Sequence, residues 1–285
     1  MKTKKDPLVS VIVTTKNEAG NIKRFFESII SQTYKNIESI VVDNNSSDKT
    51  VLITKKYTQK VFNYGPERSA QRNYGAKKSK GKYVLFLDAD MELSDKVVEN
   101  CVRTAQKLDL KILTIPEATV GLGLMPSIRK FEREMYLGDI NYEVPRFFDK
   151  DIFLEYKGYD EKLTGPEDYD LPFRMRNKYK SGRIKGFIYH HEEGLTILRL
   201  LRKKYYYAQN GAFYALKHPS LVKIQGTILF RKVYVRNWRK FIEHPLLGIL
   251  FLIVRLLETI WAIAGFISAV GIINFLKAVT YIFVK

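Results

Sequence analysis

Two aspartates one residue apart follow a run of apolar residues in the first third of the chain. Asp88 and Asp90 come directly after residues 83–87, whose composition predicts a buried strand. Carboxylates at the end of such a strand are costly unless a cation or a hydrogen bond compensates them. Mg²⁺ and Mn²⁺ take oxygen ligands, usually one or two protein carboxylates together with water and substrate phosphates. The pair therefore indicates a metal and diphosphate site, although a plain acidic turn gives the same pattern.

A second acidic pair lies in the second half of the chain. Glu167 and Asp168 come directly before residues 171–178, a predicted helix. Acidic residues favour the first turn of a helix through its dipole, which would explain this pair without any function. His190 and His191 follow it, and one of them could contact a metal ion or a phosphate, although both could equally be structural.

The elements around these residues predict an α/β fold. Strands and helices alternate along the first 90 residues, which implies a parallel sheet with right-handed crossovers. The expected strands are 9–14, 37–42, 61–62 and 83–87, and the expected helices are 22–31, 44–56 and 68–78. Sheets of this kind bind ligands beyond the carboxyl ends of their strands. No Gly-x-Gly-x-x-Gly or Walker lysine follows the first strand, so a dinucleotide site or a P-loop is disfavoured.

Polar side chains are expected together at that edge of the sheet. Thr14 and Thr15 end the first strand, Asp43 ends the second, and Asp88 and Asp90 end the fourth. Because the carboxyl ends of parallel strands meet at one edge, we expect three strands to deliver these residues to a single crevice.

Length and composition suit one large α/β domain with an appendage. The chain has 285 residues, of which 46% are hydrophobic, enough for a substantial core. The single cysteine, Cys101, excludes an internal disulfide, and we expect it to be a core residue of a protein in a reducing compartment. The apolar run 8–13 near the N-terminus is too short for a signal peptide and predicts a strand.

The net charge of +18 is concentrated in one region. Residues 195–242 contain eleven Lys or Arg and no Asp or Glu. Such a block suits nucleic acid or an anionic membrane surface. The following tract, 246–284, is overwhelmingly apolar and carries only Arg255, Glu258 and Lys277 as charges. Because the basic block is followed by an apolar tract, a membrane surface is favoured over nucleic acid as its partner.

Three arrangements of the apolar tract remain open. Two helices could insert as a hairpin, since residues 259–276 are uncharged and close to spanning length, with Arg255 and Glu258 one turn apart and able to pair. Alternatively, both helices could lie in the interface, held by basic side chains and by Trp238 and Trp261. The third arrangement is an apolar helical subdomain packed on the core. We expect peripheral or integral attachment to a membrane.

Five motifs together resemble the family 2 nucleotide-sugar glycosyltransferases with the GT-A fold. Their order and spacing match that family across residues 8–193. The resemblance implies a Rossmann-like, mostly parallel sheet flanked by helices, here followed by C-terminal hydrophobic helices. No Gln-x-x-Arg-Trp motif of processive synthases follows the second acidic pair, which favours transfer of a single sugar. The motifs are Val9–Glu18, Val42–Asp48, Gln71–Ala76, Leu87–Asp90 and Gly165–Leu171.

The resemblance also implies roles for individual residues. The loop after the first strand and the acid after the second would hold the base and ribose. Arg72 would lie near the base or the diphosphate, and Arg68 would add a phosphate contact, for which a guanidinium fork is well shaped. Asp90 would bind Mg²⁺ or Mn²⁺, with Asp88, His190 or His191 as further candidate ligands. The implied nucleotide-sugar site comprises Thr14, Thr15, Asn17, Glu18, Asp43, Arg68, Arg72 and Asp88.

The second acidic pair would carry the reaction. By the resemblance, Asp168 is the general base that takes a proton from the acceptor hydroxyl, and Glu167 is its neighbour on the sugar or acceptor side. Direct displacement would invert the anomeric centre, as in an inverting hexosyltransferase, while the metal offsets charge on the leaving diphosphate. A phosphate acceptor would not need so strong a base. Thr14-Thr15-Lys16 and Asn44 depart from the common family motifs, which leaves the base preference open.

We expect three regions in the chain. Residues 1–194 form the GT-A catalytic domain, with a donor half at 8–115 and an acceptor half at 116–194. Residues 195–242 form basic juxtamembrane helices, and residues 243–285 form a membrane-associated helical tail. The apolar loop 121–126 suggests a lipid-facing surface. The expected acceptor is therefore a lipid-linked glycan or polyprenyl carrier, at the cytoplasmic face of the cell membrane, in cell envelope glycan synthesis.

Two other functions are weighed against this one. A membrane-anchored protein that binds nucleotide sugars without turnover would share the fold, but it would be marked by loss of an acidic pair, and both pairs are present. Nucleic-acid binding would use the basic block with Tyr205, Tyr206 and Tyr207 as stacking platforms. An aromatic belt at a membrane interface explains these tyrosines at least as well, so no nucleic-acid partner is expected.

Overall fold

The computed structural model describes residues 6–218 and 231–284. Residues 1–5, Lys285 and the middle of the predicted basic segment, 219–230 with Lys223, lie outside the described residues. The chain divides into two compact units, and the boundary passes through helix α7 (Glu167–Met175). Unit 1 comprises Met1–Glu117, Val144–Glu161 and Leu171–His191. Unit 2 comprises Ala118–Glu143, Lys162–Asp170 and Glu192–Lys285.

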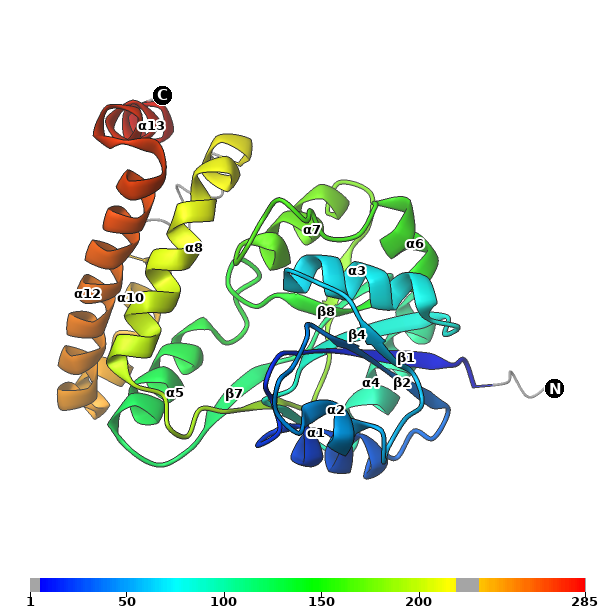
Figure 1. Ribbon diagram of the computed structural model, residues 1–285. Helices are drawn as coiled ribbons and strands as arrows, with labels where there is room; N and C mark the ends of the chain where they lie inside the picture. The colour runs from blue at the N-terminus through cyan, green and yellow to red at the C-terminus, as the bar shows by residue number, and fades with distance from the viewer. Residues whose placement is uncertain (1–5, 219–230, 285) are drawn as a thin grey trace. The chain divides into compact units, whose positions relative to one another are not determined.

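A seven-stranded sheet with the order β3-β2-β1-β4-β8-β6-β9 forms the centre of unit 1 (Figure 1). Strands β3, β2, β1 and β4 are parallel, whereas β8 runs antiparallel to both of its neighbours. The predicted mostly parallel α/β sheet is therefore confirmed. The strands are β1 (Val9–Thr15), β2 (Ile37–Asp43), β3 (Val61–Asn63), β4 (Tyr83–Asp88), β6 (Ile112–Thr114), β8 (Pro145–Asp149) and β9 (Ser181–Arg183).

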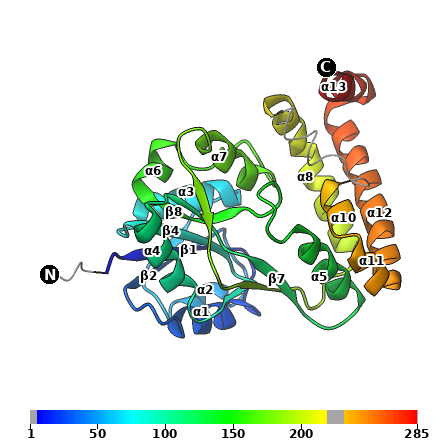
Figure 2. The same cartoon turned by 180° about the vertical axis from the view of Figure 1, so that it is seen from behind.

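Helices cover both faces of this sheet because side chains alternate along each strand (Figures 1 and 2). Val9, Val11 and Val13 of β1 pack with α1 (Ile22–Ile30) and α4 (Val97–Leu108). The other face holds the core around Ile12, Val84 and Phe86, together with residues of α3 (Arg68–Lys78), α6 (Lys150–Glu155) and the last part of α7. Remaining short elements that begin in unit 1 are α2 (Thr50–Thr54), β5 (Met91–Leu93), β7 (Glu117–Val120) and β10 (Ile188–His191).

Unit 2 is helical, with its own apolar core. Phe131 and Met135 pack with Leu200, Val233 and Phe251, which come from three further helices of the unit. Helices α12 and α13 are the predicted apolar C-terminal helices; their boundary lies at Gly271, so Arg255 and Glu258 sit inside one continuous helix. The helices are α5 (Leu124–Tyr136), α8 (Ile197–Lys217), α10 (Lys232–Arg236), α11 (Arg239–Glu243), α12 (Pro245–Val270) and α13 (Ile272–Val284).

Candidate active site

Asp88, at the end of β4, lies between two arginines of α3. Arg72 Nη2 donates to Asp88 Oδ1 at 2.9 Å, and Arg68 Nη1 lies 3.5 Å from Asp88 Oδ2. Thr14 Oγ1, at the end of β1, donates to Asp88 Oδ1 at 3.4 Å. The Arg72 side chain is 0% exposed. The structure thus brings together four of the predicted donor-site residues at the carboxyl edge of the sheet.

Nearby arginine side chains keep Asp88 ionised. Burial raises the pKa of this carboxyl, but Arg72, Arg68 and Arg146 together outweigh burial and hold the pKa well below its usual range. Asp88 is therefore a carboxylate at neutral pH. Guanidinium groups at this edge of the sheet suit a diphosphate, whose oxygens they can bind in pairs.

Helix α3, which carries Arg68 and Arg72, is held against β1 and β2 by close packing and hydrogen bonds. A Cβ atom on Gly75 would lie 2.5 Å from Ile12 Cγ2, so only glycine lets α3 approach β1 this closely. Gln71 Nε2 donates to the carbonyl oxygens of Val42 at 2.7 Å and Thr15 at 3.3 Å, which ties the helix to the ends of β2 and β1. Arg68 and Arg72 are one helical turn apart and so share a face.

Asp43 is built into the loop that follows its strand. Its Oδ1 accepts from Thr15 Oγ1 and Ser46 Oγ, each at 2.6 Å, and its Oδ2 accepts from the Ser46 backbone at 2.8 Å. Asp43 is buried. The carboxylate therefore fixes the shape of the loop after β2, and Thr15 shares this task.

The loop after β1 is bonded to the loop after β2. Asn17 has a φ of 58°, a region that asparagine tolerates, and its Oδ1 accepts from the Ser47 backbone at 2.8 Å. The backbone of Glu18 donates to Thr50 Oγ1 at 2.7 Å. Asn17 and Glu18 are thus part of a preorganised pair of loops at the same edge of the sheet as Asp43.

Asp90 differs from Asp88 in its surroundings. Within residues 6–218 and 231–284, the Asp90 side chain makes no hydrogen bond or ion pair, and only its carbonyl oxygen accepts from His191 N, at 3.0 Å. The described residues contain no group of three or more His, Cys, Asp or Glu side chains that could hold a metal. One available carboxylate fits Mg²⁺ or Mn²⁺ bound jointly with a diphosphate, because these ions take much of their coordination from phosphate and water.

Each of the two histidines is paired with a glutamate of unit 1. His190 Nε2 lies 2.8 Å from Glu117 Oε2, and His191 Nε2 lies 2.6 Å from Glu92 Oε2. Glu117 also accepts from Arg146 Nε at 2.5 Å. The metal role of either histidine stays a prediction.

Arg146 is a residue of this site that the sequence analysis missed. It was placed in the acceptor segment, yet it is buried on β8, where Phe147 pairs with Leu85 of β4 and the antiparallel direction carries Arg146 toward Asp88. A lone arginine at the start of the apolar strand Pro145–Asp149 is the signal that could have identified it, because a buried guanidinium needs a carboxylate partner.

The second acidic pair belongs to unit 2. Glu167 is buried and Asp168 is half-buried, both in the first turn of α7. Nearby Asp170 is fully buried, and its Oδ1 lies 2.7 Å from His218 Nε2 and 2.9 Å from Lys217 Nζ. These contacts fix the start of α7 to the end of α8.

Part of the chain resembles known proteins in sequence. Residues 10–160 match the family model Glycosyl transferase family 2. An uncharacterised glycosyltransferase of Methanocaldococcus jannaschii is 34% identical over 204 residues, covering 64% of this chain and 69% of the relative. An uncharacterised glycosyltransferase of Rickettsia typhi is 28% identical over 203 residues, covering 65% of this chain. The match spans 62% of the Rickettsia protein's length.

The fold resembles that of a solved glycosyltransferase. Mannosyltransferase PcManGT from Pyrobaculum calidifontis, in complex with GDP-Man and Mn²⁺, superposes with a TM-score of 0.59 at 15% identity, covering 98% of this chain and 81% of that one. At this identity the likeness shows the fold. Together with the family match over more than half of the chain, it shows that this chain belongs to glycosyl transferase family 2 and has the GT-A fold.

Proposed function

We propose that the chain transfers a single sugar from a nucleoside diphosphate sugar to an acceptor hydroxyl or phosphate, with inversion. The observation that carries the proposal is the group formed by Arg68, Arg72 and Asp88 beside the unengaged Asp90. A buried guanidinium and a half-exposed one at the carboxyl edge of the sheet suit the leaving diphosphate, whose charge grows as the sugar departs.

The donor's nucleoside would occupy the loops after β1 and β2. Thr14, Thr15, Asn17, Glu18 and Asp43 are assigned to the base and ribose. Support comes from the hydrogen bonds that join the two loops, because a preorganised loop pair does not have to be ordered when the donor binds.

A divalent cation would be held by Asp90. When bound, Mg²⁺ or Mn²⁺ would neutralise part of the diphosphate charge. The residues of the chain then have separate tasks: Arg72 and Arg68 orient the diphosphate, and Asp88, fixed by both arginines, lies toward the donor's sugar or ribose. A single protein carboxylate on the metal is the arrangement that Mg²⁺ sites with substrate phosphates favour.

Asp168 is proposed as the general base and Glu167 as its neighbour on the sugar or acceptor side. The base would take the proton of an acceptor hydroxyl as that oxygen attacks the anomeric carbon, while the diphosphate leaves from the opposite face. The bonds of Asp170 to His218 and Lys217 support this role because they fix the turn that carries both acids.

The acceptor is proposed to be a lipid-linked glycan or polyprenyl carrier at the cytoplasmic face of the cell membrane. One described helix, α12, is long and apolar enough to cross a membrane by length and composition. In the same unit, Leu122 in the loop before α5 is 94% exposed, and Leu124, the first residue of α5, is 57% exposed. Exposed aliphatic side chains next to each other suit a lipid surface better than water.

Equilibrium binding tests the donor site directly. Titration of the protein with UDP, GDP and dTDP, each with Mn²⁺ and with EDTA, should reveal one preferred base and tighter binding with the metal. The matched variant Arg68→Met should weaken binding of the diphosphates and leave binding of the corresponding nucleosides unchanged. If no nucleotide binds under any condition, the proposed function is wrong.

A further inference from the structure

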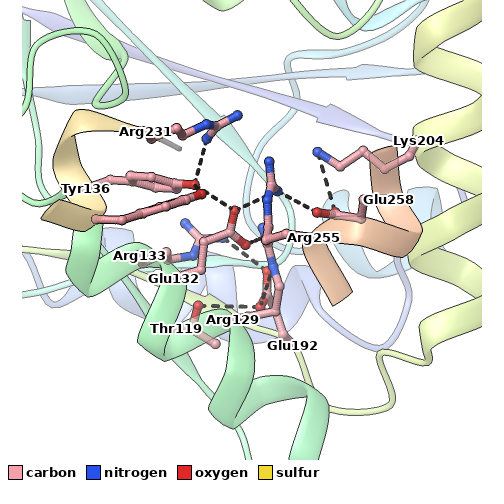
Figure 3. A network of polar contacts seen from close by, with 11 residues as sticks. Thr119, Arg129, Glu132, Arg133, Tyr136, Glu192, Lys204, Arg231, Arg255 and Glu258 are labelled. Atoms are coloured by element: carbon pink, nitrogen blue, oxygen red, sulfur yellow. Dashed lines mark hydrogen bonds and ion pairs between the residues drawn. The ribbon is translucent and has the colours of Figure 1, made fainter. Parts of the chain in front are cut away.

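Helix α12 carries two charged residues, and both point into unit 2. Arg255 is 4% exposed and Glu258 is 2% exposed. Arg255 Nη1 lies 3.0 Å from Glu132 Oε1 of α5 and 2.5 Å from Glu258 Oε2, and Lys204 Nζ of α8 lies 3.5 Å from Glu258 Oε1 (Figure 3). The middle of the most apolar helix is therefore tied by ion pairs to two charged helices.

These ion pairs belong to a larger buried network around Glu132. Arg129 pairs with the same carboxylate, and Tyr136 Oη donates to Glu132 Oε1 at 3.2 Å. Arg231 Nη1 in turn donates to Tyr136 Oη at 2.6 Å (Figure 3). Burial raises the pKa of Glu132, but Arg129, Arg255 and Lys204 outweigh burial and hold the pKa far below its usual range. The carboxylate stays charged and keeps its partners at neutral pH.

The outward face of α12 is apolar, whereas the inward face carries both charged residues of the helix. Every large side chain that α12 exposes is apolar, whereas a surface helix of a water-soluble protein turns its polar residues outward. A contiguous apolar face of this size marks a surface that binds something other than water. We call it the outer face; it consists of Leu246, Ile249, Leu252, Ile253, Leu256, Ile260, Trp261 and Ile263.

Helix α8 lies alongside α12 and is too basic to enter a bilayer (Figures 1 and 2). The two helices contact each other from the pair Lys204 and Glu258 to the pair Gln209 and Ser268. Gln209 Nε2 donates to Ser268 Oγ at 3.2 Å. A Cβ atom on Gly265 would lie 2.3 Å from the Tyr205 carbonyl oxygen, so the two helices touch backbone to backbone. Four cations on one turn and a half of α8 would each be costly in hydrocarbon. The α8 residues concerned are Arg199, Arg202, Lys203 and Lys204.

We propose that α12 does not cross the membrane but lies along its surface, with its outer face in the boundary between headgroups and acyl chains of an anionic bilayer. A crossing α12 would bring the ion pairs of Arg255 and the basic face of α8 to the middle of the bilayer.

An anionic lipid surface fits the surroundings of the outer face. Arg239 precedes α12 and Lys277 follows it, and basic residues beside an apolar face attract anionic headgroups. Arg236 and Lys240 also precede α12, but they pair with Asp139 and Glu134. Trp238 and Trp261 are both exposed, and tryptophan favours the headgroup level. The inference rests on the membrane attachment in the proposed function and goes beyond it by fixing the orientation of α12.

Labelling from one side of a membrane tests the orientation. Glu243→Cys and Asn274→Cys place a thiol before and after α12, and the native Cys101 is fully buried. Inside-out vesicles from an expressing bacterial host are treated with a membrane-impermeant maleimide before and after detergent. A surface-lying α12 predicts that both thiols react before detergent is added. Reaction of Asn274→Cys only after detergent, with Glu243→Cys reacting before, would overturn the proposal.

Substitution of the outer face tests its occupant. Ile249→Glu combined with Leu256→Glu should lower co-flotation with phosphatidylcholine–phosphatidylglycerol vesicles by at least about tenfold. The reason is that two aliphatic side chains that would be buried in the bilayer are replaced by charged ones. The matched control is Leu108→Glu on α4, also an exposed leucine, at 58%, which should bind vesicles as the wild type does. Vesicle binding that the double substitution leaves unchanged would overturn the proposal.

Two further outcomes separate the inference from the proposed function. If the wild-type protein ignores vesicles and instead forms a dimer that the double substitution dissociates, a second copy covers the outer face and the inference fails. Nucleotide binding by the same samples is independent of this face and tests the proposed function separately. All variants should bind the preferred nucleotide as tightly as the wild type, which also shows that they are folded.

Discussion

At the scale of single residues, the donor site depends on how Asp88 is compensated. Its partner Arg72 is fully buried, whereas Arg68 is 34% exposed. The two arginines therefore differ in what their removal costs, even though they contact the same carboxylate. Removing one partner of a buried ion pair leaves an uncompensated charge, while an exposed pair contributes little to stability.

The substitution Arg72→Met should destabilise the protein by about 3 kcal/mol and abolish measurable diphosphate binding, because Asp88 loses its closest cation. Arg68→Met should change stability by at most about 1 kcal/mol while weakening diphosphate binding. Urea unfolding and nucleotide titration of both variants measure these effects. Equal stabilities of the two variants would contradict the distinction between a buried and an exposed partner.

The pKa of Asp88 gives a prediction for acid stability. A carboxyl whose pKa is depressed in the folded state contributes stability above its unfolded pKa, and this contribution is lost as pH falls through the folded pKa. Below about pH 4, where the unfolded carboxyl binds a proton, the wild type should lose stability faster than Asp88→Asn. Urea unfolding midpoints of the wild type and of Asp88→Asn, measured from about pH 7 to about pH 3, test this prediction. If the two midpoints fell in parallel as the pH is lowered, the prediction would be contradicted.

The unengaged carboxylate of Asp90 gives a prediction about metal. Asp90→Ala should weaken donor binding in the presence of Mn²⁺ to the level that the wild type shows in EDTA, because Asp90 is the residue proposed to hold the ion. Titration with the preferred nucleotide in both conditions measures this difference. A variant that still binds more tightly with Mn²⁺ than with EDTA would place the metal on another ligand.

At the scale of elements, the sequence pattern predicted where the strands end but not how the loops close. The apolar runs before Thr14, Asp43 and Asp88 are local signals, so the carboxyl edge could be predicted. The bonds of Asp43 to Ser46 and Thr15 depend on loop geometry that no local pattern encodes. The antiparallel direction of β8 was also missed, because strand direction follows from connections distant in sequence.

Helix α12 shows a second limit of pattern reasoning. Arg255 interrupts the apolar run, and the pattern gave no boundary between the two expected helices, whereas the structure continues the first of them to Val270. The charge is tolerated because Glu132 and Glu258 compensate it. These partners, on α5 and one turn further along α12, determine which face of the helix points inward.

The substitution Arg255→Met should destabilise unit 2 by about 3–5 kcal/mol, because it leaves two buried carboxylates without their shared cation. Lys277→Met on α13 removes an exposed charge and should stay within about 0.5 kcal/mol of the wild type. Thermal unfolding followed by circular dichroism compares the two. If Arg255→Met unfolds at the same temperature as Lys277→Met, the ion pairs of Figure 3 do not hold α12 in place.

At the scale of the whole molecule, the two compact units divide the tasks of the proposed reaction. Unit 1 holds the proposed donor site, and the family match at residues 10–160 covers most of its first segment. Unit 2 holds the proposed base, the basic helices and the apolar tail. The net charge of +18 is concentrated on the residues that precede the tail. This distribution suits an enzyme that takes a soluble donor and a membrane-bound acceptor.

Release of nucleoside diphosphate measures directly whether the chain transfers a sugar and whether Asp168 is the base. The wild type and Asp168→Asn are incubated with UDP-, GDP- and dTDP-sugars, membrane lipid extract and Mn²⁺. The account predicts release from one class of donor by the wild type, and a loss of at least about a hundredfold in Asp168→Asn with donor binding retained. No release from any donor that the wild type binds would indicate a binding protein without turnover. Near-wild-type release by Asp168→Asn would contradict the assignment of the base.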